Sequence, residues 1–522
     1  MYKMLLLFFI LTLLLGCKED PSDKVAFDKG DTQTLSEQLV FISPNEEKLI
    51  YTGRWDQSNP AKPKVTWSGS TVIIRFKGTN LIAKLENETG VDQFRVVING
   101  KAKEKVFKVS TGINNYILAE NLEDTEHTII LVKETLYNKA TVFHGFYGDG
   151  HLLPPQPRPT LRLAFFGDSN MDGSSNYSEK NQGDSGSYYA YPAMVTRMLG
   201  AEMNLQALGG ATLDNNDDND VKSFIYSLDY HNQNINYRSG FKPDVIIVNA
   251  GANDLGAGKE VIKSRFTEVV KDLRNVYGEK PNIVLMNAYG WDVNEPANYT
   301  QALVEELGGK LSVLHFPWLW EQWHGSQWDH SGQAYMLAEH ITSLDTNWQI
   351  EHDNDIVDGF GRNGDFSNGS FEFKAPFGGF GWRYIEDGVE RIKNPEQAAE
   401  GQYYIRLIEG TEVHQPTDAT ADLKPGATIG NEVYTITAKI RAVGPQAKAK
   451  ITTHFEGQQL YTHDDDPSTF QSTDFVLTPK WQTYQHEAKA NEGVWTIFNY
   501  IKATQGTIEV DDVKMTFSRQ IK

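Results

Sequence analysis

The stretch LRLAFFGDS, residues 161–169, decides the fold of this chain. Its first six residues are a short apolar run of the kind that forms a strand buried on both faces, and Gly167, Asp168 and Ser169 then form a sharp turn. Other segments of strand length lie at residues 203–208, 244–248, 282–286 and 311–314, and apolar residues with helical spacing lie at 190–199, 259–276 and 333–341. Strands that alternate with helices predict a parallel α/β sheet over residues 160–347, covered by helices on both faces.

Glycine and polar residues follow the ends of these strands in a regular order. Gly209 and Gly210 come after the second strand, Gly251-Ala252-Asn253-Asp254 after the third, and Asp329-His330 just before the last predicted helix. One sheet edge can gather all of them, because the carboxyl ends of parallel strands meet there. A serine nucleophile needs a base within hydrogen-bond reach and donors aimed at the developing oxyanion. The pattern therefore favours nucleophilic catalysis by Ser169.

Each of these blocks also has a simpler interpretation. Gly167 and Gly251 could be ordinary turn glycines, His330 could merely start a helix, and Asn253-Asp254 could be a helix cap. The four blocks in their order resemble the SGNH (GDSL-type) hydrolase superfamily, which has a flavodoxin-like sheet. The resemblance implies that Ser169 is the nucleophile and His330 its base.

The resemblance also implies an oxyanion hole. Its donors would be the backbone N–H groups of Ser169 and Gly210 and the side-chain amide of Asn253, with Gly209 as the alternative to Gly210. Glycine lets a backbone N–H approach the oxyanion closely, and an amide donates without titrating.

The sequence departs from the superfamily pattern at the acid of the triad. The usual acid stands three residues before the histidine, where this chain has Gln327. Asp329 is adjacent to His330, and side chains of neighbouring residues tend to diverge. Three arrangements stay open: Asp329 is repositioned, another acid serves, or a backbone carbonyl orients His330 in a Ser–His dyad. We favour the dyad.

Residues 35–152 alternate with strand period and predict an N-terminal β-sandwich, and the proline-rich residues 153–159 mark its end. Sequences around Trp55 and Trp67 resemble the sandwich that precedes the hydrolase domain in carbohydrate esterase family 2, whose members deacetylate xylan and glucomannan. Four tryptophans before the catalytic histidine could stack on sugar rings or pack in the core: Trp318, Trp320, Trp323 and Trp328.

Residues 355–522 predict a second β-sandwich (jelly roll), which resembles galactose-binding-like carbohydrate-binding modules. In such modules carboxylates near the first and last strands often hold a structural calcium, so Glu372 and Asp512 are candidate ligands; the alternative is that they cap strand ends. The acidic residues 214–220 are interpreted as a solvated loop. Three tryptophans of this domain could line a sugar face or the core: Trp382, Trp481 and Trp495.

The first seventeen residues predict a lipoprotein signal peptide. A short apolar run follows Lys3 and ends at Gly16-Cys17, which resembles the bacterial lipobox. Cys17 is the chain's one cysteine and the predicted site of acylation; a plain secretory signal or an uncleaved anchor helix is the alternative. Residues 18–34 then form a polar tether, so we expect a protein held in the bacterial cell envelope by lipid, on the periplasmic face or the outer surface of the outer membrane.

The net charge of −20 argues against nucleic acid as a partner and is compatible with neutral polysaccharide. We therefore expect an esterase that removes acetyl or other acyl groups from polysaccharide and needs no cofactor for catalysis. Two alternatives are a general lipid or aryl esterase and a non-catalytic glycan-binding lipoprotein. Only the glutamine at position 327 favours the second alternative.

Overall fold

The structure is a computed structural model of the 522-residue chain. It describes residues 28–29, 39–103, 105–135, 140–174, 186–215, 219–230, 234, 236–286, 303–314, 324, 327–353, 366, 368–372, 382, 388–418, 430, 432–456, 469–492, 494 and 496–519.

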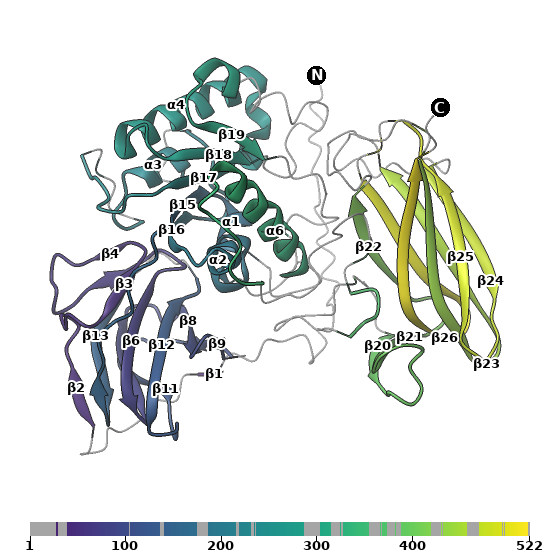
Figure 1. Cartoon of the computed structure of the whole chain (residues 1–522), viewed down its shortest axis with the longest axis horizontal. Coiled ribbons are helices and arrows are strands. Elements are labelled where there is room, and N and C mark those ends of the chain that lie inside the picture. Colours follow the sequence, from purple (N-terminus) through teal and green to yellow (C-terminus); the bar gives the residue numbers. More distant parts are fainter. Residues whose placement is uncertain are drawn as a thin grey trace, which may run out of the picture.

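The central domain is built on a five-stranded parallel sheet (Figure 1). Its strands are β15 (Arg162–Gly167), β16 (Glu202–Ala207), β17 (Val245–Asn249), β18 (Asn282–Met286) and β19 (Leu311–Leu314). Their spatial order is β16-β15-β17-β18-β19, or 2-1-3-4-5 in chain order, which is the flavodoxin-like arrangement. The predicted fold class of this domain is confirmed. In such sheets the ligand site lies where the strand order reverses, here between β15 and β17.

Each face of this sheet has its own hydrophobic core. Leu163 and Phe165 of β15 pack with α2 (Tyr191–Met198) and α6 (Gln327–Leu344). Ala164 and Phe166 point the other way and pack with α3 (Val221–Ile225) and α4 (Lys259–Tyr277). Four consecutive apolar residues, Leu163 to Phe166, are therefore needed, because both faces of the strand are buried there.

Helix α6 begins earlier than the sequence predicted. The predicted helix covered residues 333–341, whereas α6 begins at Gln327 and so places His330 in its first turn. Gly332 is accommodated inside the helix because tertiary packing holds this segment: Ser331, Gln333 and Ala334 are all buried.

The N-terminal domain is a β-sandwich, as predicted. One sheet is centred on β8 (Gln93–Ile98), β12 (Thr125–Lys133) and β6 (Thr71–Gly78), and the other on β11 (Gly112–Ala119), β7 (Leu81–Asn87) and β13 (Thr141–Gly148). Shorter strands complete them: β2 (Val40–Ile42), β3 (Ile50–Thr52), β4 (Trp55–Asp56), β5 (Lys64–Val65), β9 (Lys101–Ala102), β10 (Phe107–Lys108) and β14 (His151–Leu152). The structure differs from the prediction at residues 18–34, which were predicted as a tether. Within them, β1 (Asp28–Lys29) is a short strand that pairs with β10 of the sandwich.

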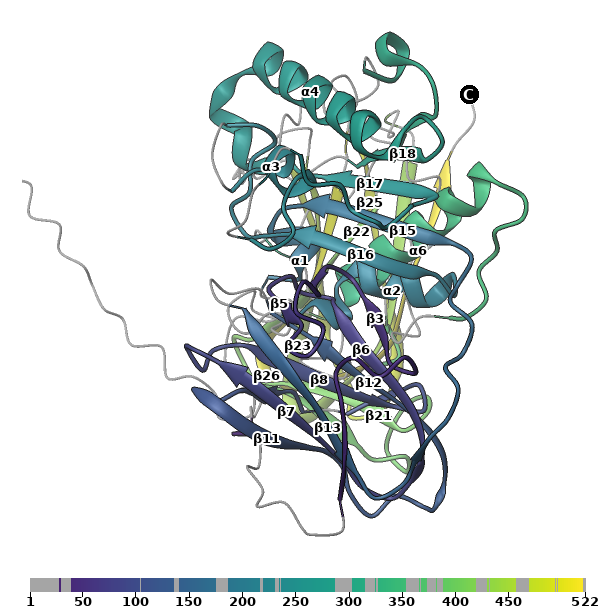
Figure 2. The ribbon, with the colours of Figure 1, turned by 90° about the vertical axis from the view of Figure 1, so that its left-hand side faces the viewer.

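The sandwich packs on the edge of the parallel sheet. Figure 2 shows β16 as the strand of that sheet nearest to the sandwich. Val97 and Val132 of the sandwich belong to the core between the sheet and α2/α6, and Trp67 belongs to the core on the other face. Because the edge strand β16 is covered, it does not present a free backbone edge to solvent.

The C-terminal domain is a seven-stranded antiparallel sheet with a core of its own. Its strands are β20 (Val389–Lys393), β21 (Tyr403–Leu407), β22 (Glu412–Asp418), β23 (Glu432–Glu456), β24 (Phe470–Val476), β25 (Gln482–Lys489) and β26 (Thr496–Arg519). The sequence predicted a sandwich of short strands, but β23 and β26 run through the whole domain and join its two halves. Their pairing shifts between Val443 and Lys448, where Gly444 and Gln446 have positive φ, so each long strand continues past an irregularity that looked like a turn.

Candidate active site

Ser169 stands at the carboxyl end of β15, as the first residue of the short helix α1 (Ser169–Asp172). The carboxylate of Asp168 caps this helix by accepting the Asn170 N–H at 3.0 Å. The turn requires glycine at Gly167, because a Cβ there would lie 2.5 Å from the Asn249 carbonyl oxygen of the neighbouring strand. Ser169 is half-buried, so its hydroxyl can meet a substrate.

The glycines after β16 lie beside the nucleophile. A Cβ added to Gly209 would come within 3.8 Å of the Ser169 Cβ. The Gly209 N–H donates to the Asp172 carboxylate at 2.9 Å, whereas the Gly210 N–H makes no hydrogen bond to any described residue. Of the two glycines that the sequence left open, Gly210 therefore has the donor that can serve an oxyanion.

Asn253 lies in the 3₁₀ helix η2 (Ala252–Ala257), directly after β17. Its side-chain amide is exposed and donates to the Ala211 carbonyl at 2.9 Å. An amide nitrogen carries two hydrogens, so a second donor remains for a ligand. The neighbouring Asp254 pairs with Arg265 and accepts the Leu213 N–H, so it anchors the loop after β16. The structure thus brings Ser169, Gly210 and Asn253 to one sheet edge.

His330 lies in the first turn of α6 and is buried against α2. Its Nδ1 accepts the backbone N–H of Tyr191 at 3.3 Å, and its ring stacks on the Tyr191 ring with 5.9 Å between centroids. The Tyr191 hydroxyl in turn accepts the Asn249 amide at 2.9 Å. Burial, together with His324, lowers the pKa of His330 to about 3, so the imidazole is neutral. No hydrogen bond joins Ser169 to His330 in the described structure; catalytic contacts of this kind often tighten only when substrate binds.

The backbone carbonyl that we favoured as the partner of His330 stays a prediction, because the described contact to Nδ1 is of another kind. It is a backbone donor, and its source is the start of α2. Tyr191 is the first residue of that helix, and Ala190 before it gives no side-chain cap. The first N–H groups of a helix lack intrahelical partners, so one of them is available to the imidazole. Gln327 is buried one turn before His330 on α6, and the side chain of Asp329 lies outside the described residues.

Two carboxyl groups flank the nucleophile: Asp168 is buried, and Asp172 is partly exposed. Burial raises the pKa of Asp168 to about 7 and that of Asp172 to about 6. Backbone N–H donors oppose the rise at both groups, and at Asp172 the Ser174 hydroxyl opposes it as well. The nucleophile turn therefore contains two carboxyl groups that titrate near neutrality.

Several predicted residues lie outside the described part of the chain. These are Cys17, Trp318, Trp320, Trp323 and Trp495, together with the side chain of Trp328. Trp382 is fully buried in the C-terminal core, which is the packing alternative. Trp481 is half-buried beside Tyr404 and beneath Arg441, with 4.6 Å from the guanidinium to its ring.

The two candidate calcium ligands have protein partners. Glu372 accepts the N–H groups of Gln402 and Tyr403 at 2.7 and 2.8 Å, and Asp512 pairs with Lys439 and Lys514 at 2.9 and 2.6 Å. Among the described residues no group of three or more histidine, cysteine or acidic side chains is placed to hold a metal ion. These contacts agree with the capping alternative, and the calcium site stays a prediction.

Sequence reasoning missed two residues that shape the site. Tyr191 holds His330, and Glu134 of the sandwich accepts the Tyr188 N–H at 2.8 Å, three residues before Tyr191. The one available signal was the unbroken apolar run at residues 129–132 before Glu134, since such a run indicates a strand with both faces buried.

Comparison with known proteins shows which families the first two domains match. Residues 51–157 match the family described as Carbohydrate esterase 2 N-terminal, and residues 165–333 match the GDSL-like Lipase/Acylhydrolase family. A curated relative, the cellulase/esterase CelE of Acetivibrio thermocellus, is 27% identical over 331 residues, which are 58% of this chain and 40% of the relative. The chain thus spans well under half the length of that relative.

Solved structures share the fold. A family two carbohydrate esterase from Clostridium thermocellum in complex with cellohexaose is 23% identical, with a TM-score of 0.51 over 56% of this chain and 98% of the other. An acetyl xylan esterase from Butyrivibrio proteoclasticus is 19% identical, with a TM-score of 0.53 over 58% and 98%.

The fold and the site define the domain from β15 to α6 as an SGNH hydrolase domain. The sandwich before it matches the N-terminal domain of carbohydrate esterase family 2, so the chain joins these two kinds of domain.

Proposed function

We propose that the protein hydrolyses acetyl and related acyl esters on polysaccharide such as xylan or glucomannan. The observation that carries the proposal is the position of Ser169 at the β15/β17 switch point, with Gly210 and Asn253 at the same edge, in a chain with the two-domain arrangement of carbohydrate esterase family 2. One relative was solved in complex with cellohexaose and another is an acetyl xylan esterase, which supports a carbohydrate ester as the substrate.

The proposed reaction needs no cofactor. His330 accepts the Ser169 proton as the serine oxygen attacks the acyl carbonyl, and the oxyanion is held by the Gly210 N–H and the Asn253 amide. Collapse expels the sugar hydroxyl, which receives the proton from His330. Water then attacks the acyl-enzyme by the same route, releases the acid and restores Ser169.

For this reaction the acceptor nitrogen of His330 must face the serine. Because Nδ1 accepts the Tyr191 N–H, the proton of the neutral imidazole lies on Nε2 in the described orientation. We propose that, when substrate binds, the imidazole makes a half-turn in the plane that its stacking on the Tyr191 ring defines, and so brings an acceptor nitrogen to the serine.

Acetate release from acetylated xylan and glucomannan tests the proposal. We expect release by the natural chain, loss on Ser169→Ala, and little release from a long-chain acyl ester. Preference for the long-chain ester would favour the general lipid esterase, and equal release with Ser169→Ala would favour the non-catalytic glycan-binding protein.

We further propose that Cys17 is acylated and holds the enzyme on the bacterial cell envelope. The lipobox-like sequence before Cys17 supports this proposal. Incorporation of a labelled fatty acid, and its loss on Cys17→Ser, is the test.

A further inference from the structure

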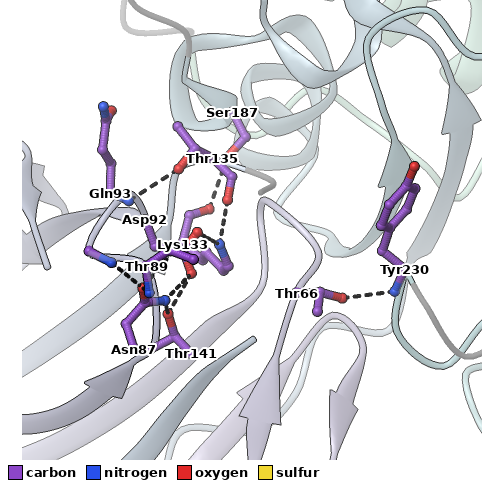
Figure 3. Close-up of polar contacts among 11 residues, drawn as sticks. Thr66, Asn87, Thr89, Asp92, Gln93, Lys133, Thr135, Thr141, Ser187 and Tyr230 are labelled. Carbon is purple, nitrogen blue, oxygen red and sulfur yellow. Dashed lines mark hydrogen bonds and ion pairs between the residues drawn. The ribbon is translucent and has the colours of Figure 1, made fainter. Parts of the chain in front are cut away.

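The end of β12 in the sandwich is hydrogen-bonded to the segment that leads into α2. Ser187 donates its N–H to the Glu134 carbonyl at 3.0 Å and its hydroxyl to the Lys133 carbonyl at 3.2 Å. The Tyr188 N–H donates to the Glu134 carboxylate at 2.8 Å. Figure 3 shows Ser187 directly above Lys133 and Thr135. Three hydrogen bonds therefore fix the 3₁₀ helix η1 (Ser187–Tyr189) to the sandwich.

Four fully buried charges support this contact. Lys133 pairs with Asp92 at 2.8 Å, and Arg95 pairs with Glu134; none of the four side chains is exposed. Asn87 and Thr141 donate to the Asp92 carboxylate (Figure 3). Buried charges are tolerated only in well-paired geometry, so the partners hold one another in a defined position.

The aromatic residues of η1 are held as well. The Arg95 guanidinium lies 5.4 and 5.1 Å from the ring centres of Tyr188 and Tyr189, which is within cation–π range. The charge of Arg95 therefore acts on both Glu134 and η1.

The other end of this segment reaches the catalytic residues. The Gly186 N–H donates to the Gly173 carbonyl at 3.2 Å, at the end of the helix that begins with Ser169. Tyr191 contacts His330 through its N–H and its ring. Residues 186–191 thus connect the sandwich to both the nucleophile helix and the base.

We propose that Glu134 of the sandwich is a positioning residue for His330, acting through η1 and Tyr191. This inference rests on the proposed esterase function. The sandwich then has a part in catalysis, because the orientation of the base depends on its contact with η1.

The test compares variants at two hydrogen-bonded contacts between the same two domains. Glu134→Gln and Ser187→Ala weaken the contact at η1. Thr66→Ala is the matched control, because the Thr66 hydroxyl accepts the Tyr230 N–H at 3.1 Å elsewhere between the domains (Figure 3). The readouts are kcat and KM for p-nitrophenyl acetate, the pH profile of kcat/KM, and the thermal midpoint.

We expect Glu134→Gln to lower kcat about tenfold and Ser187→Ala about threefold, with KM within about twofold, because small displacements of a catalytic group are costly. Thr66→Ala should leave kcat and the pH profile unchanged. A loosened His330, exposed to water beside His324 and Tyr191, should move the acid limb of kcat/KM up towards the ordinary imidazole range.

Equal kcat and equal pH profiles in Ser187→Ala and Thr66→Ala would overturn the inference. Ser187→Ala decides the matter alone if Glu134→Gln does not fold. A natural chain that hydrolyses the ester, and a Ser169→Ala chain that does not, show that the proposed function stands whatever the variants do. No hydrolysis by the natural chain would instead overturn the proposed function and this inference with it.

Discussion

Two β-rich domains flank the hydrolase domain, and they relate to it in different ways. The N-terminal sandwich contributes Trp67, Val97 and Val132 to the cores of the parallel sheet. Among the residues that the structure describes, the core of the C-terminal domain consists of residues of that domain, from Phe366 to Met515. Both domains give the same alternating signal in the sequence, so strand pattern alone does not tell an accessory domain from one that completes its neighbour.

The difference lies in the outward faces of the strands. On β12, Ile130 and Val132 face outward from the sandwich and are apolar, whereas β24 and β25 alternate exposed and more buried positions. An apolar second face must be covered, and here the hydrolase domain covers it.

Deletion of whole domains gives the largest expected effect. A chain that begins at residue 160 should be insoluble or inactive, because Trp67 and Val132 are lost from the cores and β16 becomes a free edge. A chain that ends at residue 353 should keep activity on p-nitrophenyl acetate within about twofold, because a domain with its own core can fold alone. Soluble expression and kcat are measured. A soluble, active chain from residue 160 would show that the hydrolase domain does not depend on the N-terminal sandwich.

Removal of a single charged side chain should likewise destabilise the N-terminal sandwich more than the C-terminal domain. Arg95→Ala leaves Glu134 buried without its ion-pair partner and should cost about 3–5 kcal/mol of unfolding free energy. Arg406→Ala in the C-terminal domain should cost about 1 kcal/mol or less, because Arg406 is 37% exposed and Glu509 keeps Arg441. Urea titration of both variants measures the costs, and equal costs would contradict the contrast.

Asp168→Asn tests the pH dependence of the hydrolase domain. The pKa of Asp168 is about 7 in the folded chain, whereas the ordinary value for an aspartate is 3.8. The folded state therefore binds more protons between these values and loses stability as the pH rises through them. Asparagine keeps the cap without the buried charge. The variant should gain on the order of 1–2 kcal/mol at pH 8 and nothing at pH 4. Thermal unfolding at both pH values is the measurement. An equal change of the midpoint at both would show that the titration of Asp168 is not the cause.

The smallest effect is expected at the ends of the C-terminal strands. Asp512→Asn removes pairs with Lys439 and Lys514, which are partly exposed, so the loss should be below about 1 kcal/mol. Addition of EDTA should not change the unfolding of this domain, because protein groups already bind Glu372 and Asp512. A lower midpoint with EDTA, restored by calcium, would support the calcium site.

The parallel sheet and the nucleophile turn were predictable because both depend on local sequence. The central strands β15, β17 and β18 contain short apolar runs, and Ser169, Gly210 and Asn253 follow strand ends within a few residues. The predicted strand at 161–166 differs from β15 by one residue, since burial on both faces leaves no alternation to mark its ends.

The contacts of His330 and Glu134 were not predictable in the same way. The hydrogen bond from Tyr191 to His330 depends on how α2 packs on α6, 139 residues apart in the chain. Lys133 and Glu134 look like the solvated end of a strand until their partners Asp92 and Arg95 are known. The long strand β23 was likewise hidden, because Gly444 and Pro445 are typical of a turn.

The covered edge of β16 also constrains how such chains can be recombined. Gly69 of the sandwich lies so close to β16 that a Cβ there would be 2.6 Å from the Met203 side chain. At this position the two surfaces fit so closely that the sandwich has room for glycine alone. We expect that a chimera which takes its sandwich from a relative must also take β16 and the η1–α2 segment from that relative. The C-terminal domain should be exchangeable by itself.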